Sequence, residues 1–321
     1  MPSEFDLIKR CFTRPTRHTV LGVGDDGALI APSPGHELVI STDLLVEGTH
    51  FFPDAEPEAL GWKTLAVNVS DMAAMGATPR WATLGIAVPP APTFDWLDKF
   101  AQGFFACAEA FGVDLIGGDT TRAAANTRCF SVTIMGEVPA GSAIRRSGAQ
   151  AGDQVWVSGW PGRAALGLAH LVGAGQAREQ LCEPQIRGHG PLLQECLNAL
   201  HRPQPRVALG LALRGLATSA IDVSDGLLAD LGHILDASGV GATLDTVPAD
   251  AGETYLAGGD DYELVFTAPA ARDAEIIALA RQLDLPLTRI GRIEAGASKV
   301  RVINHEGRDI TPARRGYDHF A

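Results

Sequence analysis

Apolar and polar positions follow two different periods along this 321-residue chain, and each period predicts one kind of element. Residues 37–46 (ELVISTDLLV) are mostly apolar and β-branched, which predicts a strand. Residues 57–75 predict a helix, since Pro57 suits a first helical turn and Gly76 suits the end of a helix. A second amphipathic helix is predicted at residues 95–111, where aromatic side chains recur at helical spacing.

Shorter segments continue the alternation to the end of the chain. Strands are predicted at residues 113–116, 128–138, 154–158, 220–223, 262–266 and 288–293. Helices are predicted at residues 162–172, twice between 191 and 217, and after the strand at 220–223 up to Gly239. This order is typical of α/β and α+β folds. The small and polar residues 147–153 (SGAQAGD) predict a boundary, so we expect two domains, residues 1–148 and 149–321.

Composition and charge narrow the classes of protein to which this chain can belong. Hydrophobic residues make up 46% of the chain and charged residues 20%, which is typical of folded globular proteins. The formal net charge of -12 and the isoelectric point of about 5.2 disfavour binding to nucleic acid or to anionic lipid. We expect neither a membrane span nor a signal peptide, because no apolar run is long enough. The five cysteines form no C-x-x-C pair, so we expect reduced thiols in a cytoplasmic protein.

Residues 22–27 (GVGDDG) match the G-x-G-x-x-G pattern of dinucleotide-binding loops. We reject this interpretation because no long helix follows the loop, where a pyrophosphate would bind. The carboxylates of Asp25 and Asp26 would also repel a phosphate unless a cation intervened. A polar turn would explain the loop as well, but we favour metal binding.

Further acids occur in segments that are otherwise apolar. Alternation along the strand 37–46 places Ser41 and Asp43 on one face and Thr42 on the other. Asp71 lies on the apolar stripe of the helix 57–75, where an unpaired carboxylate would be costly or protonated. Metal ligation would resolve this conflict, and an arginine partner is the alternative. His50, taken by itself, is more often a structural than a functional residue.

Three loops that combine glycines with acids complete the set. Residues 117–122 (GGDTTR) directly follow a predicted strand, and their paired glycines allow a ligand close to the backbone. In residues 222–228 (DVSDGLL), Ser224 or Asp225 can cap the helix that follows, but capping does not explain all three polar residues. Residues 258–263 (GGDDYE) lead into a strand. Plain turns remain an alternative for the first and third loops, whereas metal or phosphate binding is favoured for the second.

Nine aspartates therefore occur in these loops, strand ends and apolar helix stripe. Their hard oxygen ligands suit Mg²⁺, which proteins hold with a few carboxylates and substrate phosphates. The histidines and cysteines lack zinc spacing, and there is neither a calcium loop of the EF-hand type nor a G-x-x-x-x-G-K-[ST] phosphate loop. With basic residues such as Arg145 and Arg146 nearby, the pattern predicts an ATP-using, magnesium-dependent phosphotransferase.

In their order along the chain, these motifs resemble the thiamine-monophosphate kinase family of the aminoimidazole-ribonucleotide-synthetase superfamily. The resemblance rests on eight segments: GVGDDGA, ISTDLLVEGTHF, VNVSDMAAMGATP, IGGDTTR, RRSGAQAGD, IDVSDGLLAD, GGDDYELVF and GYDHF. It implies an N-terminal domain that binds ATP and magnesium and dimerises through its sheet. It also implies a C-terminal α+β domain that completes the active site, with ATP between the two domains.

The resemblance implies direct in-line transfer of the γ-phosphate of ATP to thiamine phosphate, with several Mg²⁺ ions and a homodimer. The implied metal ligands are Asp26, Ser41, Thr42, Asp43, Asp71, Asp119, Asp222 and Asp225. The implied ATP contacts are Gly118, Asp119, Arg146 and Ser224. The implied contacts with thiamine phosphate are His50, Asp260 and Tyr317, and the implied catalytic groups are Asp71, Asp119 and Arg146.

One position departs from the family pattern, and other functions compete with this one. Some members use an aromatic residue near the nucleotide, where this chain has Ala101, so no adenine contact is predicted. Among sister enzymes, Cys11 lacks the glycine-rich context of selenophosphate synthetases, and the final residues lack the cysteine of hydrogenase-maturation dehydratases. Aminoimidazole-ribonucleotide synthetase is a further alternative. A protein that binds cations or nucleotides without catalysis is the alternative of a different class.

Overall fold

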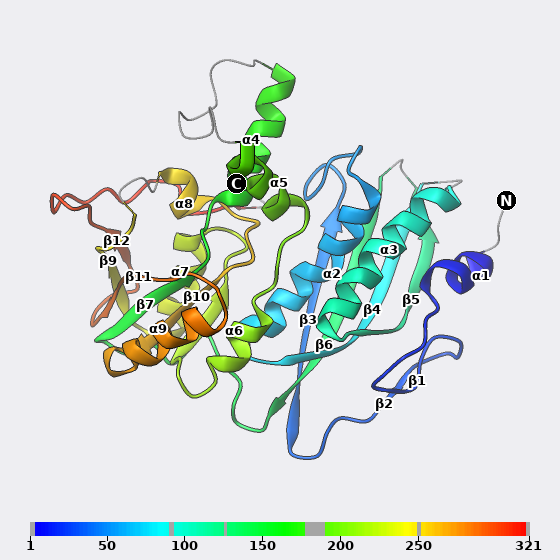
Figure 1. Ribbon diagram of the computed structural model, residues 1–321, viewed down its shortest axis with the longest axis horizontal. Coiled ribbons are helices and arrows are strands. Elements are labelled where there is room, and N and C mark those ends of the chain that lie inside the picture. The colour runs from blue at the N-terminus through cyan, green and yellow to red at the C-terminus, as the bar shows by residue number, and fades with distance from the viewer. Residues whose placement is uncertain (1–3, 90–92, 125–126, 177–189, 249–251, 319–321) are drawn as a thin grey trace. The chain divides into compact units, whose positions relative to one another are not determined.

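The computed structural model describes residues 4–89, 93–124, 127–176, 190–248 and 252–318. The chain divides into two compact units (Figure 1). The first comprises Met1–Met72 and Ala77–Ser142, and the second comprises Ala73–Gly76 and Ala143–Ala321. From Ala143 onward, all residues belong to the second unit. This change of unit lies close to the boundary predicted at residues 147–153.

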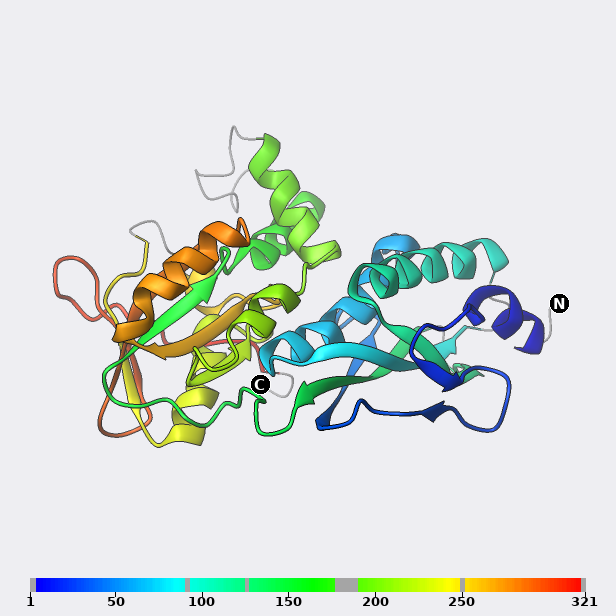
Figure 2. The same cartoon turned by 60° about the horizontal axis from the view of Figure 1, so that its bottom comes forward.

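A four-stranded sheet forms the framework of the first unit. Its order is β3 (His36–Val46), β6 (Cys129–Pro139), β4 (Thr78–Val88) and β5 (Asp114–Arg122). Only the pair of β4 and β5 is parallel. The helices α2 (Pro57–Ala74) and α3 (Phe94–Phe111) cover the same face of this sheet (Figures 1 and 2). A Cβ atom at Gly103 would lie 1.7 Å from the carbonyl oxygen of Glu58, so only glycine allows these helices to approach so closely.

Local signals explain where the two helices of the first unit begin and end. The hydroxyl of Thr93 accepts a hydrogen bond from the N–H of Trp96 at 3.3 Å and caps α3. Gly112 ends α3 in the left-handed conformation, with a φ of 68°. Glu56 accepts hydrogen bonds from the N–H groups of Glu58 and Ala59 at the start of α2. Both predicted helices are thus confirmed, as is the strand β3.

The segment that precedes β3 is held on the sheet by buried carboxylates. It contains α1 (Glu4–Leu7), a π-helical turn (Ile8–Phe12) and the pair β1 (Thr19–Leu21) and β2 (Leu29–Ile30). Asp114, which is 5% exposed, accepts hydrogen bonds from the N–H groups of Arg17 and His18 and from the hydroxyl of Thr19. Glu137 accepts further bonds from Ser33. These bonds fix both ends of the segment that carries the GVGDDG loop.

A six-stranded sheet forms the framework of the second unit, in the order β12-β9-β11-β7-β10-β8. The strands are β7 (Asp153–Ser158), β8 (Ser219–Asp222), β9 (Gly241–Leu244), β10 (Leu264–Pro269), β11 (Leu287–Glu294) and β12 (Val300–Val302). The helices are α4 (Arg163–Gln176), α5 (Gly190–His201), α6 (Val207–Ala212), α7 (Leu227–Ser238), α8 (Glu253–Ala257) and α9 (Asp273–Gln282). The predicted strands and helices of this half are confirmed, with shifted ends.

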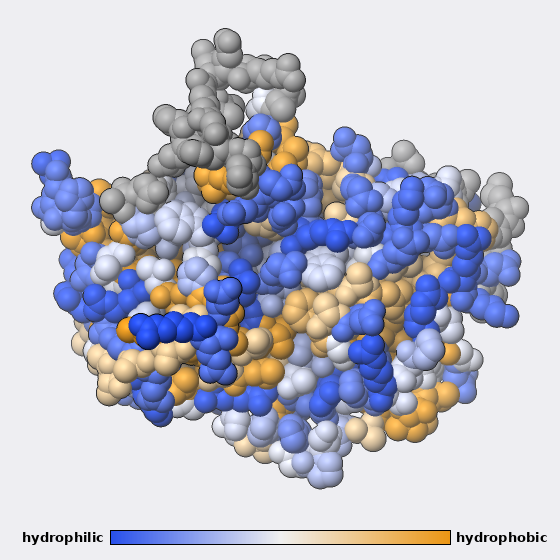
Figure 3. Space-filling model, in the orientation of Figure 1, coloured by the Kyte–Doolittle hydropathy of each residue, from blue (hydrophilic) through white to orange (hydrophobic). Residues whose placement is uncertain are grey.

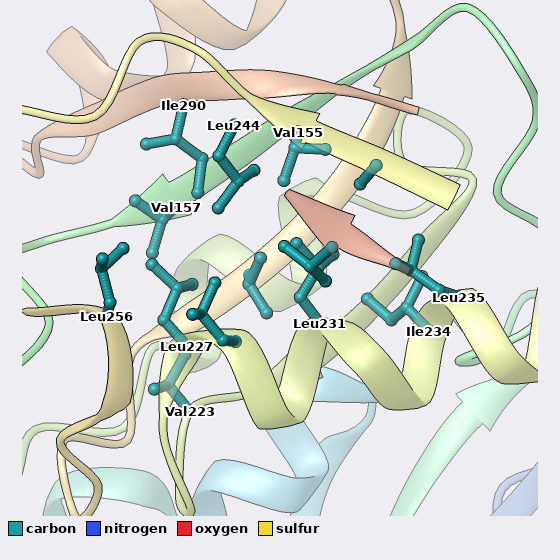
Figure 4. Close-up of a cluster of buried hydrophobic side chains, with 14 of the residues drawn as sticks. Val155, Val157, Val223, Leu227, Leu231, Ile234, Leu235, Leu244, Leu256 and Ile290 are labelled. Atoms are coloured by element: carbon teal, nitrogen blue, oxygen red, sulfur yellow. The ribbon is translucent and has the colours of Figure 1, made fainter. Parts of the chain in front are cut away.

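Alternation along β7 directs side chains into two separate cores. Val155 and Val157 pack with Leu227 and Leu231 of α7, as Figure 4 shows. Trp156 packs instead with side chains that include Leu209 of α6, Phe266 of β10 and Ile276 of α9. Both faces of this sheet are therefore covered, and α7 is fixed by the core at the end of β8.

Two parts of the sequence prediction for the first unit were wrong. The strand predicted at residues 113–116 extends as β5 to Arg122, so the GGDTTR motif lies inside a strand and does not follow one. The strand β4 (Thr78–Val88) was not predicted, since its apolar residues do not alternate strictly with polar ones. In the described part of the chain, no helix is long and apolar enough to cross a membrane. Polar and charged residues are spread over the surface that Figure 3 shows, with apolar patches between them.

Candidate functional site

In the first unit, β3 and α2 bring three of the predicted ligands together. The hydroxyl of Ser41 donates a hydrogen bond to Oδ2 of Asp71 at 2.6 Å. Asp43 follows on the same face of β3, as alternation predicted. Burial and the neighbouring charge of Asp71 raise the pKa of Asp43 to about 7. Two carboxylates that disfavour each other's charge are an arrangement that a divalent cation would stabilise.

The residues beside this group fix its backbone. Asn68 on α2 accepts a hydrogen bond from the N–H of Asp43 at 3.1 Å, and its own amide donates to Thr64 within the helix. Thr42 lies on the opposite face of β3, where its hydroxyl is 2.8 Å from that of Thr133. The side chain of Thr42 therefore points away from Asp43, and only the backbone of Thr42 could share a ligand with that residue.

His50 lies in the turn that follows β3. Its Nδ1 accepts a hydrogen bond from the N–H of Val46 at 3.0 Å, which leaves the proton of the neutral ring on Nε2. Arg128 supports the turn from outside, since its guanidinium bonds Glu47 at 2.7 Å and stacks 4.8 Å above the ring of Trp96. The geometry of His50 is therefore fixed by its own turn.

Three other predicted residues of the first unit lie apart from Asp43 in the sequence. Asp26 is exposed in the loop between β1 and β2. Gly118 and Asp119 lie in β5, opposite Leu84 and Gly85 of β4. Gly118 has a φ of 154°, and a Cβ atom there would lie 1.9 Å from the carbonyl oxygen of Leu84. Close packing of two strands thus requires Gly118, whatever ligand it contacts.

In the second unit, the DVSDG motif forms the end of β8 and the loop before α7. Asp222 is the last residue of β8 and is 5% exposed. The prediction that Ser224 or Asp225 caps α7 was wrong, because Gly226 is the N-cap residue and no side chain caps it there. The loop is held instead by Asp230, whose carboxylate accepts the backbone N–H groups of residues 224–226. The side chains of Ser224 and Asp225 therefore do not cap α7.

Two distant segments meet this loop within the second unit. The N–H of Asp260 donates to the carbonyl of Ser224 at 2.7 Å, and the N–H of Tyr317 donates to the carbonyl of Asp225 at 2.8 Å. Asp260 has a positive φ of 72°, a conformation that costs energy for a residue other than glycine and that often marks functional sites. Ser224, Asp225, Asp260 and Tyr317 are therefore brought together by backbone hydrogen bonds.

Two buried acids that we did not predict as site residues hold the loop of Asp260. Asp261 accepts hydrogen bonds from the N–H groups of Gly162 and Ala164 at the start of α4. Burial raises the pKa of Asp261 to about 8, although these hydrogen bonds oppose the rise. Glu263 accepts hydrogen bonds from the hydroxyl of Ser158 at 2.6 Å and from the guanidinium of Arg206. The sequence did not indicate that Asp261 and Glu263 are buried, because both belong to the polar segment GGDDYE.

Arg146 presents an exposed side chain on a fixed backbone. Its carbonyl accepts a hydrogen bond from the hydroxyl of Ser238 at the end of α7, at 3.3 Å. Ser238 also accepts the N–H of Gly148 at 3.1 Å. The carbonyl of Arg145 accepts the N–H of Ala220 on β8. Arg146 is therefore placed beside the C-terminal end of α7, whereas Ser224 and Asp225 lie in the loop before its N-terminal end.

The donor atoms of both units fit a hard cation better than a soft one. They are carboxylate and hydroxyl oxygens, whereas the described cysteines are free thiols, three of them buried. Within the described residues, no three side chains of His, Cys, Asp or Glu are grouped closely enough to hold a metal by themselves. A magnesium ion would therefore need hydroxyls, backbone oxygens or substrate phosphates as additional ligands.

Comparison with known proteins agrees with this distribution of residues. Residues 24–138 match the N-terminal domain of AIR synthase related proteins, and residues 150–304 match their C-terminal domain. The thiamine-monophosphate kinase of Salmonella typhimurium is 42% identical, and the match covers 99% of this chain and 98% of that protein.

Solved structures of such kinases share the fold. The crystal structure of thiamine-monophosphate kinase from Stenotrophomonas maltophilia K279a matches with a TM-score of 0.78 and 46% identity, over 89% of this chain and 91% of that chain. The structure of AaThiL complexed with AMPPCP and TMP matches with a TM-score of 0.75 and 29% identity, over 99% and 97%. The predicted two-domain fold is thereby confirmed. This chain belongs to the AIR synthase related proteins and, among them, to the thiamine-monophosphate kinases.

Proposed function

We propose that this protein transfers the γ-phosphoryl group of ATP to thiamine phosphate and releases ADP and thiamine diphosphate. The observation that carries the proposal is the half-buried group of Ser41, Asp43 and Asp71, in which desolvation and like charge raise the pKa of Asp43 to about 7. Such a group is suited to a divalent cation that accompanies phosphates. The kinases to which the chain is similar, one of them complexed with AMPPCP and TMP, support both substrates.

Magnesium is the cation that this oxygen-rich set fits best. The proposed ligands are Asp26, Ser41, Thr42, Asp43, Asp71 and Asp119 of the first unit and Asp222 and Asp225 of the second. When bound, magnesium neutralises charge on the phosphates and helps to align them. Asp71 is the ligand with the clearest support. Its hydrogen bond with Ser41 directs its carboxylate toward the face of β3 that carries Ser41 and Asp43.

The remaining residues of the proposed site bind and orient the two substrates. Gly118, Arg146 and Ser224 contact ATP, and the guanidinium of Arg146 is matched to a phosphate. His50, Asp260 and Tyr317 contact thiamine phosphate, where the ring of Tyr317 offers a face to a cationic heterocycle. The acceptor is already an anion, so no strong general base is needed. Alignment of the two anions and neutralisation of their charge supply the catalysis, with Asp71, Asp119 and Arg146 as the catalytic groups.

The protein would act as a homodimer in the cytoplasm. Support for the dimer comes from β3, an edge strand whose outer face exposes Leu38, Ile40 and Leu44 by 38%, 60% and 52%. A row of apolar side chains on a sheet is a surface that a second copy can cover. We propose that the first units of two copies pair through this face.

A coupled assay for ADP tests the function, with thiamine phosphate, thiamine and aminoimidazole-ribonucleotide precursor offered as rival acceptors. We expect turnover with thiamine phosphate alone and formation of thiamine diphosphate in equal amount. Turnover with free thiamine alone would refute the proposal. Binding of ATP without any ADP would favour the non-catalytic alternative.

Removal of the metal is a second test of the same site. We expect activity to be lost in excess EDTA and to return when Mg²⁺ is added back, because the proposed aspartate ligands and the substrate phosphates are all anionic and need a cation between them. Full turnover in EDTA would contradict the role that we assign to the aspartates.

A further inference from the structure

Asp230 lies in the first turn of α7 and is not among the residues that we assign to either substrate. Its side chain is 2% exposed. A single carboxylate oxygen, Oδ2, accepts hydrogen bonds from the N–H groups of Ser224, Asp225 and Gly226, at 3.0, 3.1 and 3.0 Å. One buried oxygen thus fixes the N–H ends of three successive peptide groups.

The carbonyl ends of the same three peptide groups bind two other segments. In chain order, the carbonyl oxygens accept N–H groups as follows: Val223 from Tyr262, Ser224 from Asp260 and Asp225 from Tyr317, at 2.9, 2.7 and 2.8 Å. Each peptide group is rigid, so its two hydrogen bonds are coupled through its plane. Asp230 is therefore connected to Asp260 and Tyr317 by single peptide groups.

Close backbone contact leaves little freedom at these connections. A Cβ atom at Gly259 would lie 2.4 Å from the carbonyl oxygen of Ser224, and one at Gly316 would lie 2.8 Å from that of Asp225. No side chain fits at either position without a shift of the loop. A displacement of the loop would therefore be passed on to both neighbouring segments.

The helix that carries Asp230 is fixed by the core of its unit. Leu227, Leu231 and Ile234 of α7 are fully buried and point at β7 and β9 in Figure 4. Asp230 thus connects the loop of residues 224–226 to α7, a helix whose position is fixed by packing in the core.

We propose that Asp230 is a positioning residue for the phosphoryl transfer assigned above, on which this inference rests. It fixes the loop that contains Ser224 and Asp225. The backbone carbonyls of that loop in turn fix the positions of Asp260 and Tyr317. It acts on the nucleotide side and on the acceptor side together, without contact with either substrate.

Asp230→Asn tests this role, because it keeps the shape of the side chain and weakens all three hydrogen bonds. We expect KM to rise for both ATP and thiamine phosphate, each about threefold to tenfold, in line with the weakening of buried hydrogen bonds. Asp230→Ala should raise both constants further. A purely structural role would lower the amount of folded enzyme and leave both KM values unchanged. The proposal is overturned if Asp230→Asn leaves both within twofold of wild type, or raises only one.

Amide hydrogen exchange provides a readout that needs no activity. In Asp230→Asn we expect residues 224–226, Asp260 and Tyr317 to lose protection together, with exchange about tenfold faster or more. Asp236→Asn, an exposed acid on the same helix, is the control and should change neither exchange nor KM. If wild-type protein does not phosphorylate thiamine phosphate, the proposed function fails while exchange still tests the link. Unchanged exchange at Asp260 and Tyr317 would overturn the link itself.

Discussion

Single residues decide how the site tolerates charge, and Asp71 is the clearest case. Asp71→Asn keeps the size of the side chain but removes one of two neighbouring charges. We expect kcat to fall by about a hundredfold or more, as when one electrostatic partner of a transition state is lost. The melting temperature should stay the same or rise, because the charge of Asp71 opposes ionisation of the half-buried Asp43.

The measurement is turnover at saturating Mg²⁺ together with a thermal melt. Asp95→Asn is a suitable control, since it changes only an exposed pair with Lys99 on α3. Turnover like that of wild type would remove Asp71 from the catalytic groups.

A second residue-scale prediction concerns Asp261 and pH. Its folded-state pKa of about 8 lies above its unfolded value near 4, so the stability linked to this group is complete at low pH and is lost as pH rises toward 8. We expect the advantage in unfolding free energy of wild type over Asp261→Asn to shrink from pH 5 to pH 8, by at most about 1.4 kcal/mol per pH unit. Melting curves of both proteins across this range provide the check. A difference that does not vary with pH would contradict the assigned protonation.

Elements impose their own requirements, and β5 shows one of them. Gly117 and Gly118 are adjacent in the same motif but differ in their surroundings. A Cβ atom at Gly117 would have no neighbouring atom within 4 Å, whereas one at Gly118 would lie 1.9 Å from the carbonyl oxygen of Leu84. Gly118→Ala should therefore disturb the pairing of β4 and β5 and cost about 2 kcal/mol or more in unfolding free energy, through overpacking and a strained φ.

Gly117→Ala is the matched control and should cost less than about 1 kcal/mol. Denaturant unfolding of both variants measures the difference. If Gly118→Ala is as stable as its control but fails to bind ATP, the glycine serves the nucleotide and not the strand pair.

At the scale of the whole molecule, the homodimer that we propose depends on the outer face of β3. Ile40→Glu places a charge in the middle of the exposed apolar row, where it would be desolvated if a second copy covers that row. We expect sedimentation velocity to show a shift from dimer to monomer. Ile277→Glu on α9, which is 45% exposed in wild type, should leave the dimer intact. A monomeric wild-type protein, or a dimer that survives Ile40→Glu, would contradict pairing through this face.

Much of the fold followed from local signals. The strand at 37–46 and the helices at 57–75 and 95–111 were predicted because periodicity, Pro57, Gly76 and Gly112 all act within a few residues. The end of β5 was missed, since a strand that contains two glycines is stabilised only by its partner β4.

The sequence by itself determined the alternating elements, the acidic surface and the ordered set of aspartates that suits magnesium and phosphates. It did not distinguish the acids that ligands could use from the acids that the backbone uses. Asp114 and Asp261 each accept backbone N–H groups nearly a hundred residues away, and Asp230 holds a loop whose carbonyls bind Asp260 and Tyr317. Only the tertiary structure decides which acids bind backbone N–H groups. A hydrogen-bond partner that is distant in sequence produces no periodic pattern from which it could be predicted.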